Sequence, residues 1–525
     1  MTHEERAARL EREEIVALLA SHEQLVAEHQ QVVAQCAELK QQLEWFKRQL
    51  FGEKSERRPV GPDARQLWLG EWDRQSAAPA KEITVTEHRR RIQPLRDEEE
   101  QEDELRFDAS VPVQEIRLPH PPLDEHHEIV SEKTTYRLAQ QPASYVVLKY
   151  IRPVVKRKSD ATLTCPPAPL AVLGKSLADV SLLAGMAIDK FRYHLPLYRQ
   201  HQRMEAAGIH LARSTLTGLM HRTGDLLEPI YDALLASVLE SRVLAMDETP
   251  IKAGLKGPRK MKTGYFWPIY GDRAEVVFPF ADSREGLVIR KLLQGYAGVL
   301  LSDGYKAYDS YVGQVEAITH AQCWAHARRN FLKAENVEPG LTKTALDYIR
   351  ELYQEEARLR SRLVDDAKRL ELRARHCKPI VDAFFEWLKT TLAERILLPK
   401  NPFTEAAGYA LARKEQLRVF LEHPGVQIDT NHLEREIRPI AVGRKNWLFC
   451  WTEIGARYVG VFQSLLATCR LQAVDPYTYL VDVLQRLQDH PADQVALLTP
   501  RLWKEHFAAD PLRSAVDRPT SNAVS

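Results

Sequence analysis

The sequence predicts a multidomain chain, largely helical, that combines an N-terminal coiled coil, a small β-rich module, a helix-turn-helix and an α/β core interrupted by an all-helical insertion. Three observations lead to this fold class. The N-terminus carries a heptad repeat, the pattern changes from helical to strand-like near residue 239, and strongly helical patterns return over residues 335–425. A chain of 525 residues is also too long for one hydrophobic core.

The heptad repeat predicts a coiled coil over residues 1–55. No Gly or Pro interrupts residues 3–51. A second series runs three positions ahead of the first, as expected for an a/d seam, and is apolar except for His22 and His29. A single amphipathic helix on a globular core is the alternative, but the length of the repeat favours a coiled coil that makes the chain a homodimer or a larger assembly. The residues at seven-residue intervals are Leu18, Leu25, Val32, Leu39 and Phe46.

Two segments of different character follow the heptads. Residues 56–110 are rich in Pro, Gln and charged side chains, which is typical of a linker. Residues 111–170 alternate apolar and polar side chains, for example in "SYVVLKYIRPVVKRK", and predict a small β-rich module. Its basic end, Lys156, Arg157 and Lys158, is a candidate contact for DNA.

Residues 171–238 are expected to hold a helix-turn-helix. In "LPLYRQHQRMEAAGIHLARSTLTGLMHRTG", Ala207-Gly208 is the expected turn and Ser214 the expected N-cap of a second helix from Thr215. Residues 187–222 hold six Lys/Arg against two Asp/Glu. An ordinary helical hairpin is the alternative, but this local charge favours DNA contact. The candidate contacts are Arg213, Thr215, Thr217, His221 and Arg222.

Strand patterns then alternate with helices in the α/β core. "RVLAMDETPIKA", "GYFWPIYG", "AEVVFPFA" and "AGVLLSDGY" predict strands, and "EAITHAQCWAHARRNFL" predicts a strand that passes into a helix. The resulting order, β-β-β-α-β-α-β-α, is that of an RNase H-like domain. The first part of this core is expected at 239–334, the helical insertion at 335–425, the second part with its C-terminal helices at 426–490, and a tail at 491–525.

Two carboxylates directly follow strands of this core. Asp247 ends the first strand and Asp303 ends "GVLLS". Neighbouring strand ends can bring such side chains to one point, where oxygen ligands suit Mg²⁺ or Mn²⁺. Two aspartates alone are weak evidence, because Asp is common in turns. Glu248 and Asp309 are less favoured ligands, since Glu248 should point to the other side of the backbone and Asp309 lies further along.

Several motifs together resemble a known family. "MDETPIK", "LLSDGYKAY", "CWAHARRNF", "NHLEREIRPIAVGRKNWLF" and "DPYTYLVDVL" are similar, in order and spacing, to the insertion-sequence-66 family of bacterial transposases. "LFGEKSER" and "HLPLYRQHQRMEAAGIHLARSTL" resemble it too, so the likeness runs from about residue 15 to 488. The resemblance implies a DDE transposase that binds its element's ends, then cleaves and joins DNA. Its catalytic, metal-binding acids correspond to Asp247, Asp303 and Glu434, with two Mg²⁺ or Mn²⁺ ions.

The charged stretch around Glu434 gains an interpretation from the resemblance. Basic side chains on its helix are expected to face DNA phosphates. Asp429 precedes the helix and looks like its cap. Glu436 lies two residues beyond Glu434, so it should point away from the site. The basic candidates are Arg435, Arg438, Arg444 and Lys445.

The "CWAH" motif, with Cys323 and His326, resembles a CxxH found after the second aspartate in several DDE groups. One CxxH supplies only two ligands, and a packed helix start is the favoured alternative. Trp324 between them is more simply a core residue than a base-stacking one. The family usually carries a Cys-rich knuckle near residues 112–168, but only Cys165 is present there, so no zinc is expected.

The implied partners are double-stranded DNA, as terminal inverted repeats and target, a second copy of the chain, and small accessory proteins of the same element. The chain lacks an apolar signal core and an uninterrupted run of eighteen apolar residues, and its six cysteines are scattered. A cytoplasmic protein, nucleoid-associated when DNA-bound, is therefore expected. The alternative function is a transposase-derived DNA-binding protein without catalysis.

Overall fold

The computed structural model describes Val26 and residues 105–118, 127–141, 144–169, 171–174, 176–257, 260–362, 364–395, 397–398 and 400–517. The expected coiled coil and nearly all of the expected linker lie outside these ranges and stay predictions. Within the described part of the chain, no helix is long and apolar enough to cross a membrane.

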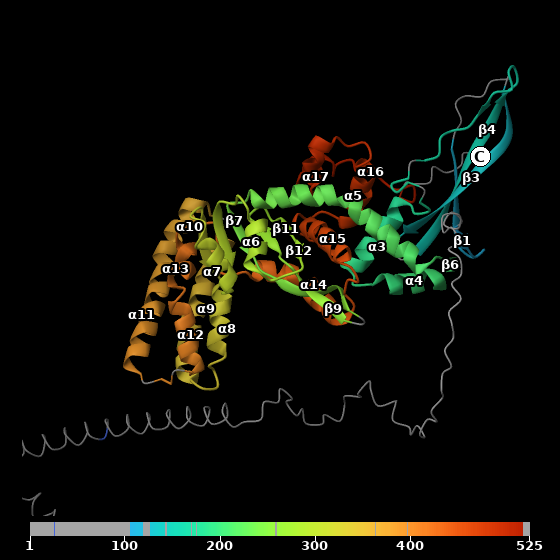
Figure 1. The fold of residues 1–525 in the computed structure, drawn as a ribbon. Coiled ribbons are helices and arrows are strands. Elements are labelled where there is room, and N and C mark those ends of the chain that lie inside the picture. The colour runs from blue at the N-terminus through green and yellow to red at the C-terminus, as the bar shows by residue number, and fades with distance from the viewer. Residues whose placement is uncertain are drawn as a thin grey trace, which may run out of the picture.

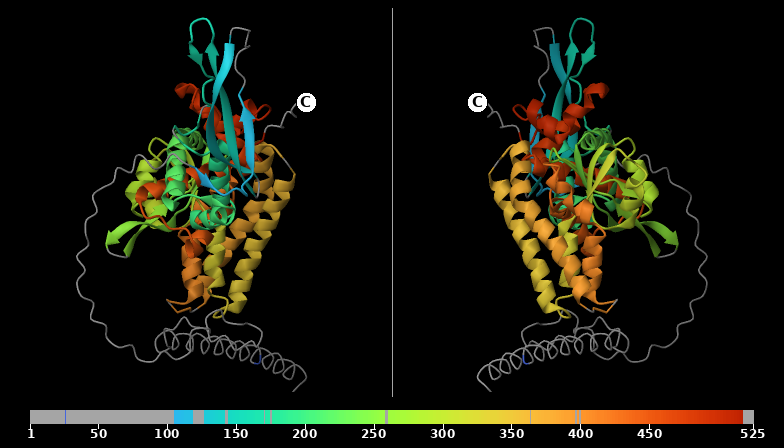
Figure 2. Two further views of the ribbon diagram at one scale, coloured as in Figure 1. Left: turned by 90° about the vertical axis from the view of Figure 1, so that its right-hand side faces the viewer. Right: turned by 90° about the vertical axis from the view of Figure 1, so that its left-hand side faces the viewer.

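The described residues form an elongated molecule with three regions (Figure 1). A bundle of long helices stands at one end, a mixed region of sheets and helices occupies the middle, and a long β arm projects from the other end. Figure 2 shows the bundle and the arm from the two sides of the molecule. The fold is therefore a mixture of helix and sheet, as the patterns predicted.

The β arm contains the predicted β-rich module. Strands β3 (His127–Gln141) and β4 (Ser144–Arg157) pair antiparallel over nearly their whole length, while β2 (Val113–Arg117) runs parallel to β4. A short strand, β5 (Leu163–Thr164), pairs with the far end of β4. The turn end of the hairpin meets the body, where Leu138 pairs with Ala178.

Three helices join the arm to the centre: α3 (Val180–Phe191), α4 (Leu197–Ala206) and α5 (Arg213–Leu239). The turn falls where predicted, with Gly208 at φ +78°, a conformation that favours glycine. Between α4 and α5, strand β6 (Ile209–His210) pairs with β1 (Arg106–Phe107).

The predicted start of the second helix is wrong. Helix α5 begins at Arg213, its N-cap is Ala212, and no side chain caps it, so Ser214 lies inside the first turn. The helix also continues to Leu239 because its apolar face packs against a C-terminal helix, where Gly224 meets the Tyr458 ring. Tertiary packing therefore decides the extent of this helix more than the local capping signal does.

A five-stranded sheet forms the centre, in the order β11-β10-β7-β13-β14. Strand β7 (Val243–Met246) pairs parallel with β13 (Gly298–Ser302), which pairs parallel with β14 (Ile318–Gln322). Strands β10 (Ile269–Gly271) and β11 (Val276–Val277) run antiparallel on the other side of β7. The strands are nearly all buried, because helices cover the sheet.

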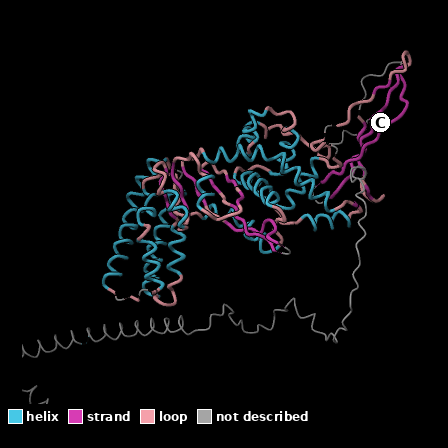
Figure 3. Tube along the Cα trace, in the orientation of Figure 1, coloured by secondary structure: helices cyan, strands magenta, loops and turns pink. Residues whose placement is uncertain are grey.

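A second, three-stranded sheet contains β8 (Thr249–Gly257), β9 (Lys260–Phe266) and β12 (Phe280–Ala281). The segments "GYFWPIYG" and "AEVVFPFA" were each predicted to be one strand, and each is divided between the two sheets. Pro268 and Pro279 lie at the two divisions. Proline donates no ladder hydrogen bond, which favours a break at these points. Figure 3 shows the strands of both sheets between the helices.

Helices α6 (Gly286–Leu292), α7 (Lys306–Val312) and α8 (Trp324–Leu332) connect or follow the parallel strands. The expected helical insertion then consists of α9 (Pro339–Ser361), α10 (Asp366–Leu372), a π-helical turn (Arg373–Cys377), α11 (Lys378–Glu394), α12 (Pro402–Leu411) and α13 (Lys414–Arg418).

An aromatic core joins α8 to this bundle. Trp324 is 1% exposed, donates its indole N–H to the Leu417 carbonyl at 2.9 Å, and packs against the Phe384 and Phe385 rings. The preference for a core role of Trp324 is confirmed, so this tryptophan is unavailable to a DNA base.

A buried ion pair fixes the end of the insertion. Arg373 and Glu356 are 2% and 4% exposed, and two guanidinium nitrogens of Arg373 donate to the two carboxylate oxygens at 2.8 and 2.9 Å. The same guanidinium donates to the carbonyls of Phe420 at 2.6 Å and Val426 at 2.9 Å. It therefore holds the segment through which the chain leaves the bundle.

Helices α14 (Asn431–Asn446), α15 (Glu453–Leu471) and α16 (Pro476–Arg486) follow. The segment expected only as a tail, residues 491–525, is folded over residues 491–517, although disorder was expected from residue 505. A 3₁₀ segment (Ala492–Leu498) and α17 (Pro500–His506) are formed, and buried Ser514 donates a hydrogen bond to Asp179 at 2.6 Å. Tail residues are thus held by the apolar and polar contacts they make with the body.

Candidate active site

Asp247 and Asp303 lie at the same edge of the central sheet. Each is the first residue after its strand, β7 or β13, and these strands are parallel neighbours with Leu301 opposite Ala245. Parallel strands that pair in this way end on the same side. Glu434 lies in the first turn of α14.

The electrostatics place the three carboxylates in one neighbourhood. Burial is the largest cause that raises the pKa of Asp247, and the negative charges of Glu248, Asp303 and Glu434 add to it; together they raise this pKa to about 7. A bound cation or a shared proton would reduce this repulsion between carboxylates. Sequence reasoning predicted this grouping of Asp247, Asp303 and Glu434, and the structure brings them near one another.

Local hydrogen bonds orient each of these side chains. The Asp247 carboxylate accepts the backbone N–H of Glu248 at 2.7 Å, and Asp303 accepts that of Tyr305 at 2.8 Å. Glu434 is partly exposed and forms an ion pair with Arg329 of α8 at 3.4 Å. An exposed pair of this kind contributes little stability, so Glu434 is free to exchange Arg329 for another cation at small cost.

Among the described residues, no three His, Cys, Asp or Glu side chains are arranged to hold a metal ion as they stand. The chemistry of the donor set nevertheless fits one: three carboxylates, of which Asp247 is crowded by its neighbours and Glu434 pairs with a single exposed arginine. Oxygen donors of this type suit Mg²⁺ or Mn²⁺.

The rival carboxylates have other partners. Asp429 is buried and accepts the backbone N–H of Asn431, the first residue of α14, at 3.0 Å. Glu436 is 3% exposed and pairs with Arg470 of α15. Glu248 pairs with Arg284 and accepts the Tyr308 hydroxyl at 3.1 Å. All three are therefore held by the fold, as expected for residues outside a metal site.

A serine, a histidine and an aspartate behind Asp303 were not predicted. The Ser302 hydroxyl lies 2.8 Å from His320 Nε2, and His320 Nδ1 lies 3.3 Å from the Asp309 carboxylate. Ser302 Oγ also lies 3.1 Å from the carbonyl oxygen of Asp303. Ser302 is fully buried, so this arrangement supports the backbone of Asp303 from behind. The only sequence signal was alternation within two strands, which does not reveal cross-strand partners.

The helical insertion also contacts the Asp303 loop. Tyr409 of α12 packs on Gly304, and Arg413 donates to the Gly304 carbonyl at 3.3 Å. A Cβ on Gly304 would meet the Tyr409 hydroxyl and lie 2.8 Å from its Cε2 atom. The loop therefore depends on glycine at this position, because the bundle approaches its backbone so closely.

We expect Gly304→Ala to lower DNA cleavage by roughly 10- to 100-fold. The added methyl must push either Tyr409 or the Asp303 loop away, and a displacement of about 1 Å at reacting groups has costs of this size. Single-turnover cleavage rates measure the effect. Gly286→Ala is the matched control, since its Cβ would lie 3.9 Å from Ala307 and meet nothing closer. Equal rates for both variants would contradict the steric argument.

The CxxH motif is divided between core and site. Cys323 is buried, and the backbone N–H of Thr430 points at its sulfur from 3.3 Å. His326 is half-buried, which lowers its pKa, while nearby Asp303 and Glu434 act in the opposite direction. The motif thus joins the starts of α8 and α14, and its histidine lies near Asp303 and Glu434.

The basic side chains of α14 differ in their availability. Arg435, Arg438 and Lys445 are exposed and have no ion-pair partner among the described residues. Arg444 instead donates to the Thr249 hydroxyl at 2.7 Å and the Pro250 carbonyl at 3.0 Å. Its first role is therefore to hold α14 against β8.

The residues predicted on α5 lie far from the carboxylates, at the arm end of the molecule (Figure 1). Arg213 stacks over the Tyr198 ring at 4.6 Å, and Arg222 donates to the Gly174 carbonyl at 2.8 Å. Thr217 is exposed and Thr215 is half-buried. His221 packs on the Tyr458 ring at 5.2 Å, so it is less available to a groove than predicted.

The basic cluster of the arm is also remote from the carboxylates. Lys156 and Arg157 lie where β4 pairs with the start of β3, at the opposite end of the hairpin from its contact with the body. Arg157 forms an exposed ion pair with Asp160 at 3.0 Å, and Lys158 follows directly. The structure does not bring the predicted DNA contacts into one surface.

A groove between α8 and α9 opens beside α14 and was not predicted. It has a volume of about 810 Å³ and is lined by Asn431 and by four basic side chains. Asp347 pairs with two of them, and Glu335 also lines the groove. The basic residues are Arg328, Arg329, Lys343 and Arg350.

Comparisons with known proteins show the family of the chain. The family model described as "Transposase IS66 family" matches residues 175–458, and "IS66 C-terminal element" matches residues 464–500. The chain belongs to the IS66 family of transposases. A third model, "Transposase C of IS166 homeodomain", matches residues 38–116. That match covers the expected linker, so a homeodomain-like region stands where only a connection was predicted.

Full-length relatives are similar over most of the chain. The uncharacterized protein y4hP of Sinorhizobium fredii is 30% identical over 410 residues, which cover 74% of this chain and 73% of the relative. The uncharacterized protein y4qI of the same organism is 31% identical over 413 residues, covering 75% and 76%.

Proposed function

We propose that this transposase binds the ends of its insertion sequence and catalyses metal-dependent phosphodiester cleavage and strand transfer with Asp247, Asp303 and Glu434. The observation that carries the proposal is the placement of Asp247 and Asp303 on adjacent parallel strand ends, with Glu434 near enough to raise the pKa of Asp247. Repulsion between Asp247 and its acidic neighbours is relieved by a bound cation or a shared proton, and phosphodiester chemistry uses the cation.

The central sheet supports an RNase H-like core for this reaction. The first, fourth and fifth strands of the unit, β7, β13 and β14, are parallel, and the second and third, β10 and β11, add antiparallel beyond β7. The sequence predicted the succession β-β-β-α-β-α-β-α along the chain but not the order of the strands within the sheet. On this proposal, the bundle from α9 to α13 is an insertion between the second and third acids.

Mg²⁺ or Mn²⁺, as two ions, would be held by the three carboxylates and would activate the attacking oxygen and stabilise the leaving oxygen. The protein's own groups do the positioning. The Glu248 and Tyr305 backbone N–H groups orient the two aspartates. Arg413 of the insertion holds the loop that carries Asp303.

Basic surfaces on two sides of the carboxylates support DNA binding. On one side are exposed Arg435, Arg438 and Lys445 of α14, and on the other is the groove between α8 and α9. Phosphate contacts fix the position and register of DNA without reading its sequence. The more distant candidates on α5 and the arm, and the region matched by the homeodomain model, are proposed to hold parts of the transposon end further from the cut.

Assembly through the heptads into a homodimer, and cooperation with small accessory proteins of the same element, remain part of the proposal. Two copies would hold two transposon ends together. A cytoplasmic location, with nucleoid association on DNA, follows from the substrate.

Strand transfer on oligonucleotides that carry the element's terminal repeats tests the function. Full-length protein with Mg²⁺ should cut at the repeat boundary and join the product to target DNA, and chelation with EDTA should abolish both steps. Tight binding of the repeats with no cleavage in Mg²⁺ or Mn²⁺ would support the alternative, a DNA-binding protein without catalysis.

A further inference from the structure

The loop between α14 and α15 exposes two aromatic rings. Phe449 is 50% exposed and Trp451 is 64% exposed, and their ring centroids lie 5.8 Å apart at an interplanar angle of 84°. Large exposed aromatic surface is unfavourable in water and commonly marks a binding site. Neither ring has a role in the triad or in the core.

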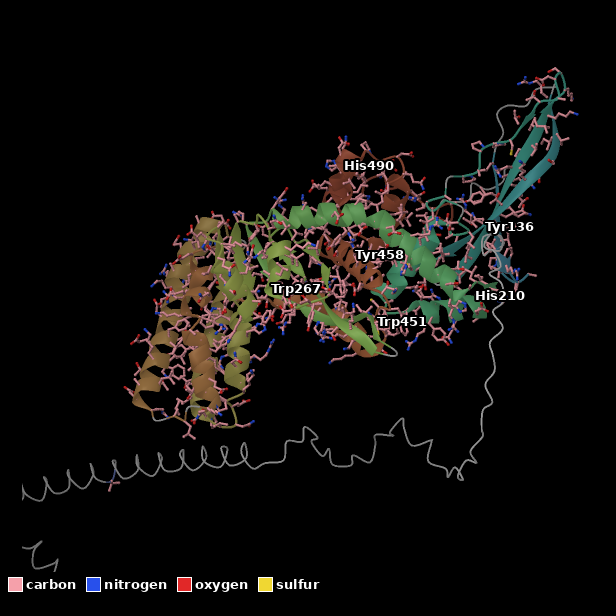
Figure 4. All side chains as sticks on the ribbon, in the orientation of Figure 1. Tyr136, His210, Trp267, Trp451, Tyr458 and His490 are labelled. Atoms are coloured by element: carbon pink, nitrogen blue, oxygen red, sulfur yellow. The ribbon has the colours of Figure 1, made fainter. Side chains whose placement is uncertain are left out.

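The backbone between these rings is fixed. Cys450 is 6% exposed, its N–H donates to the Lys252 carbonyl at 2.9 Å, and its own carbonyl accepts the Gly254 N–H at 3.0 Å. Successive side chains of an extended segment point to opposite sides. Burial of Cys450 against β8 therefore directs Phe449 and Trp451 outward. Figure 4 shows Trp451 beside the β8–β9 hairpin.

A line of exposed side chains leads from the candidate active site to these rings. Glu434, Arg438, Val442 and Lys445 are spaced by four, four and three residues, so they share one face of α14. At a rise of 1.5 Å per residue, Lys445 lies roughly 16 Å along the helix from Glu434. The helix runs toward the β8–β9 hairpin (Figure 1).

We propose that Phe449 and Trp451 form a stacking platform for unpaired bases of the DNA strand whose backbone follows α14. The inference rests on the proposed function, since it assumes DNA at the carboxylates. Bases in an intact duplex are stacked on one another and are not free to stack on the platform, whereas unpaired bases stack on aromatic side chains with little dependence on sequence. The strand near the cut is therefore expected to be unpaired when it occupies this surface.

The charges beside the rings favour DNA over a protein partner. Lys445 and Lys252 are both exposed, and neither has an ion-pair partner among the described residues, although Lys252 donates to the Thr263 hydroxyl at 2.8 Å. The nearby carboxylate of Glu453 is already paired with Lys262 at 2.9 Å. The surface is thus both aromatic and positively charged, whereas the centres of protein interfaces are depleted in charged residues.

Binding of full-length protein to a mixed-sequence single strand and to the blunt duplex of the same sequence, without metal, tests the platform. Trp451→Ala should weaken single-strand binding by about 5- to 150-fold, the range for loss of one stacked base. Duplex binding should change by less than about 2-fold. Trp451→Phe should retain most of the affinity, because a smaller ring still stacks. Quenching of 2-aminopurine in the single strand should be lost with Trp451→Ala.

Tyr136→Ala is the matched control, since Tyr136 is 41% exposed on the β arm, far from Trp451 (Figure 4). Equal losses on single strand and duplex, or no loss on either, would overturn the platform. So would unchanged DNA binding together with a smaller assembly by light scattering, which would make the patch a protein interface. Single-strand binding is measured without metal, so its result does not depend on catalysis. If this binding behaves as predicted but the protein does not cleave DNA when metal is present, the platform is supported and the proposed catalysis is refuted.

Discussion

Asp247→Asn, Asp303→Asn and Glu434→Gln should each lower DNA cleavage and strand transfer by roughly 10³-fold or more, on the scale of losing a principal electrostatic stabiliser. An amide keeps the size and hydrogen bonding of the side chain but removes the negative charge that holds a cation. DNA affinity should stay constant or rise slightly, because repulsion between phosphate and carboxylate is relieved. Single-turnover cleavage and metal-free binding assays separate the two effects.

Glu436→Gln is the control on the same helix. Burial raises the pKa of Glu436, and its partner is Arg470 on the side away from the carboxylates. The variant should lose some stability but keep most of its activity per folded molecule. Circular dichroism measures the folded fraction that this comparison needs. An active Glu434→Gln beside an inactive Glu436→Gln would show that the third acid is assigned wrongly. Normal cleavage by all three amide variants would refute carboxylate chemistry altogether.

Glu356→Gln should destabilise the helical bundle by about 3–5 kcal/mol, because it leaves the buried Arg373 guanidinium without its counter-charge. Arg373→Met should cost at least as much, since the carbonyls of Phe420 and Val426 also lose their donor. Denaturant unfolding, followed by circular dichroism, measures both. Cleavage should fall as well, because these carbonyls lie on the segment that leads into α14.

Lys378→Met provides the comparison. Its ion pair with Asp382 is in the same bundle, but both side chains are about half exposed, so the loss should stay below about 1 kcal/mol. If Glu356→Gln unfolds at the same denaturant concentration as Lys378→Met, the buried pair does not hold the bundle together in the way its geometry indicates.

The parts of the fold that follow from local patterns were predictable. Strands that end in Asp247 and Asp303 are short, apolar and followed by turn residues, so their position was visible in the sequence. The spacing within α14 likewise separated Glu434 from Glu436 correctly, because helical periodicity fixes which side chains share a face.

Features that depend on long-range contacts were not predictable. The N-terminus of α5 has no side-chain cap, and its length is decided by packing on α15. Ser302 and His320, which support Asp303, come from two different strands. Periodicity within one strand does not predict such a contact. The burial of Trp324 was predicted correctly, whereas no local pattern predicted the exposure of Trp451, because burial depends on which elements pack against the side chain.

The long helical bundle between Asp303 and Glu434 also affects when the site first exists. The two acids are separated by 131 residues, and the segment just ahead of α14 meets the start of α8 where the Trp324 backbone N–H donates to the Ile428 carbonyl at 2.9 Å. At a synthesis rate of about 5–20 residues per second, Glu434 leaves the ribosome roughly 7–26 s after Asp303. During that interval a nascent chain carries the two aspartates without the third acid. On the proposed function, such a chain would not cut DNA until the bundle has folded and Glu434 has joined the two aspartates.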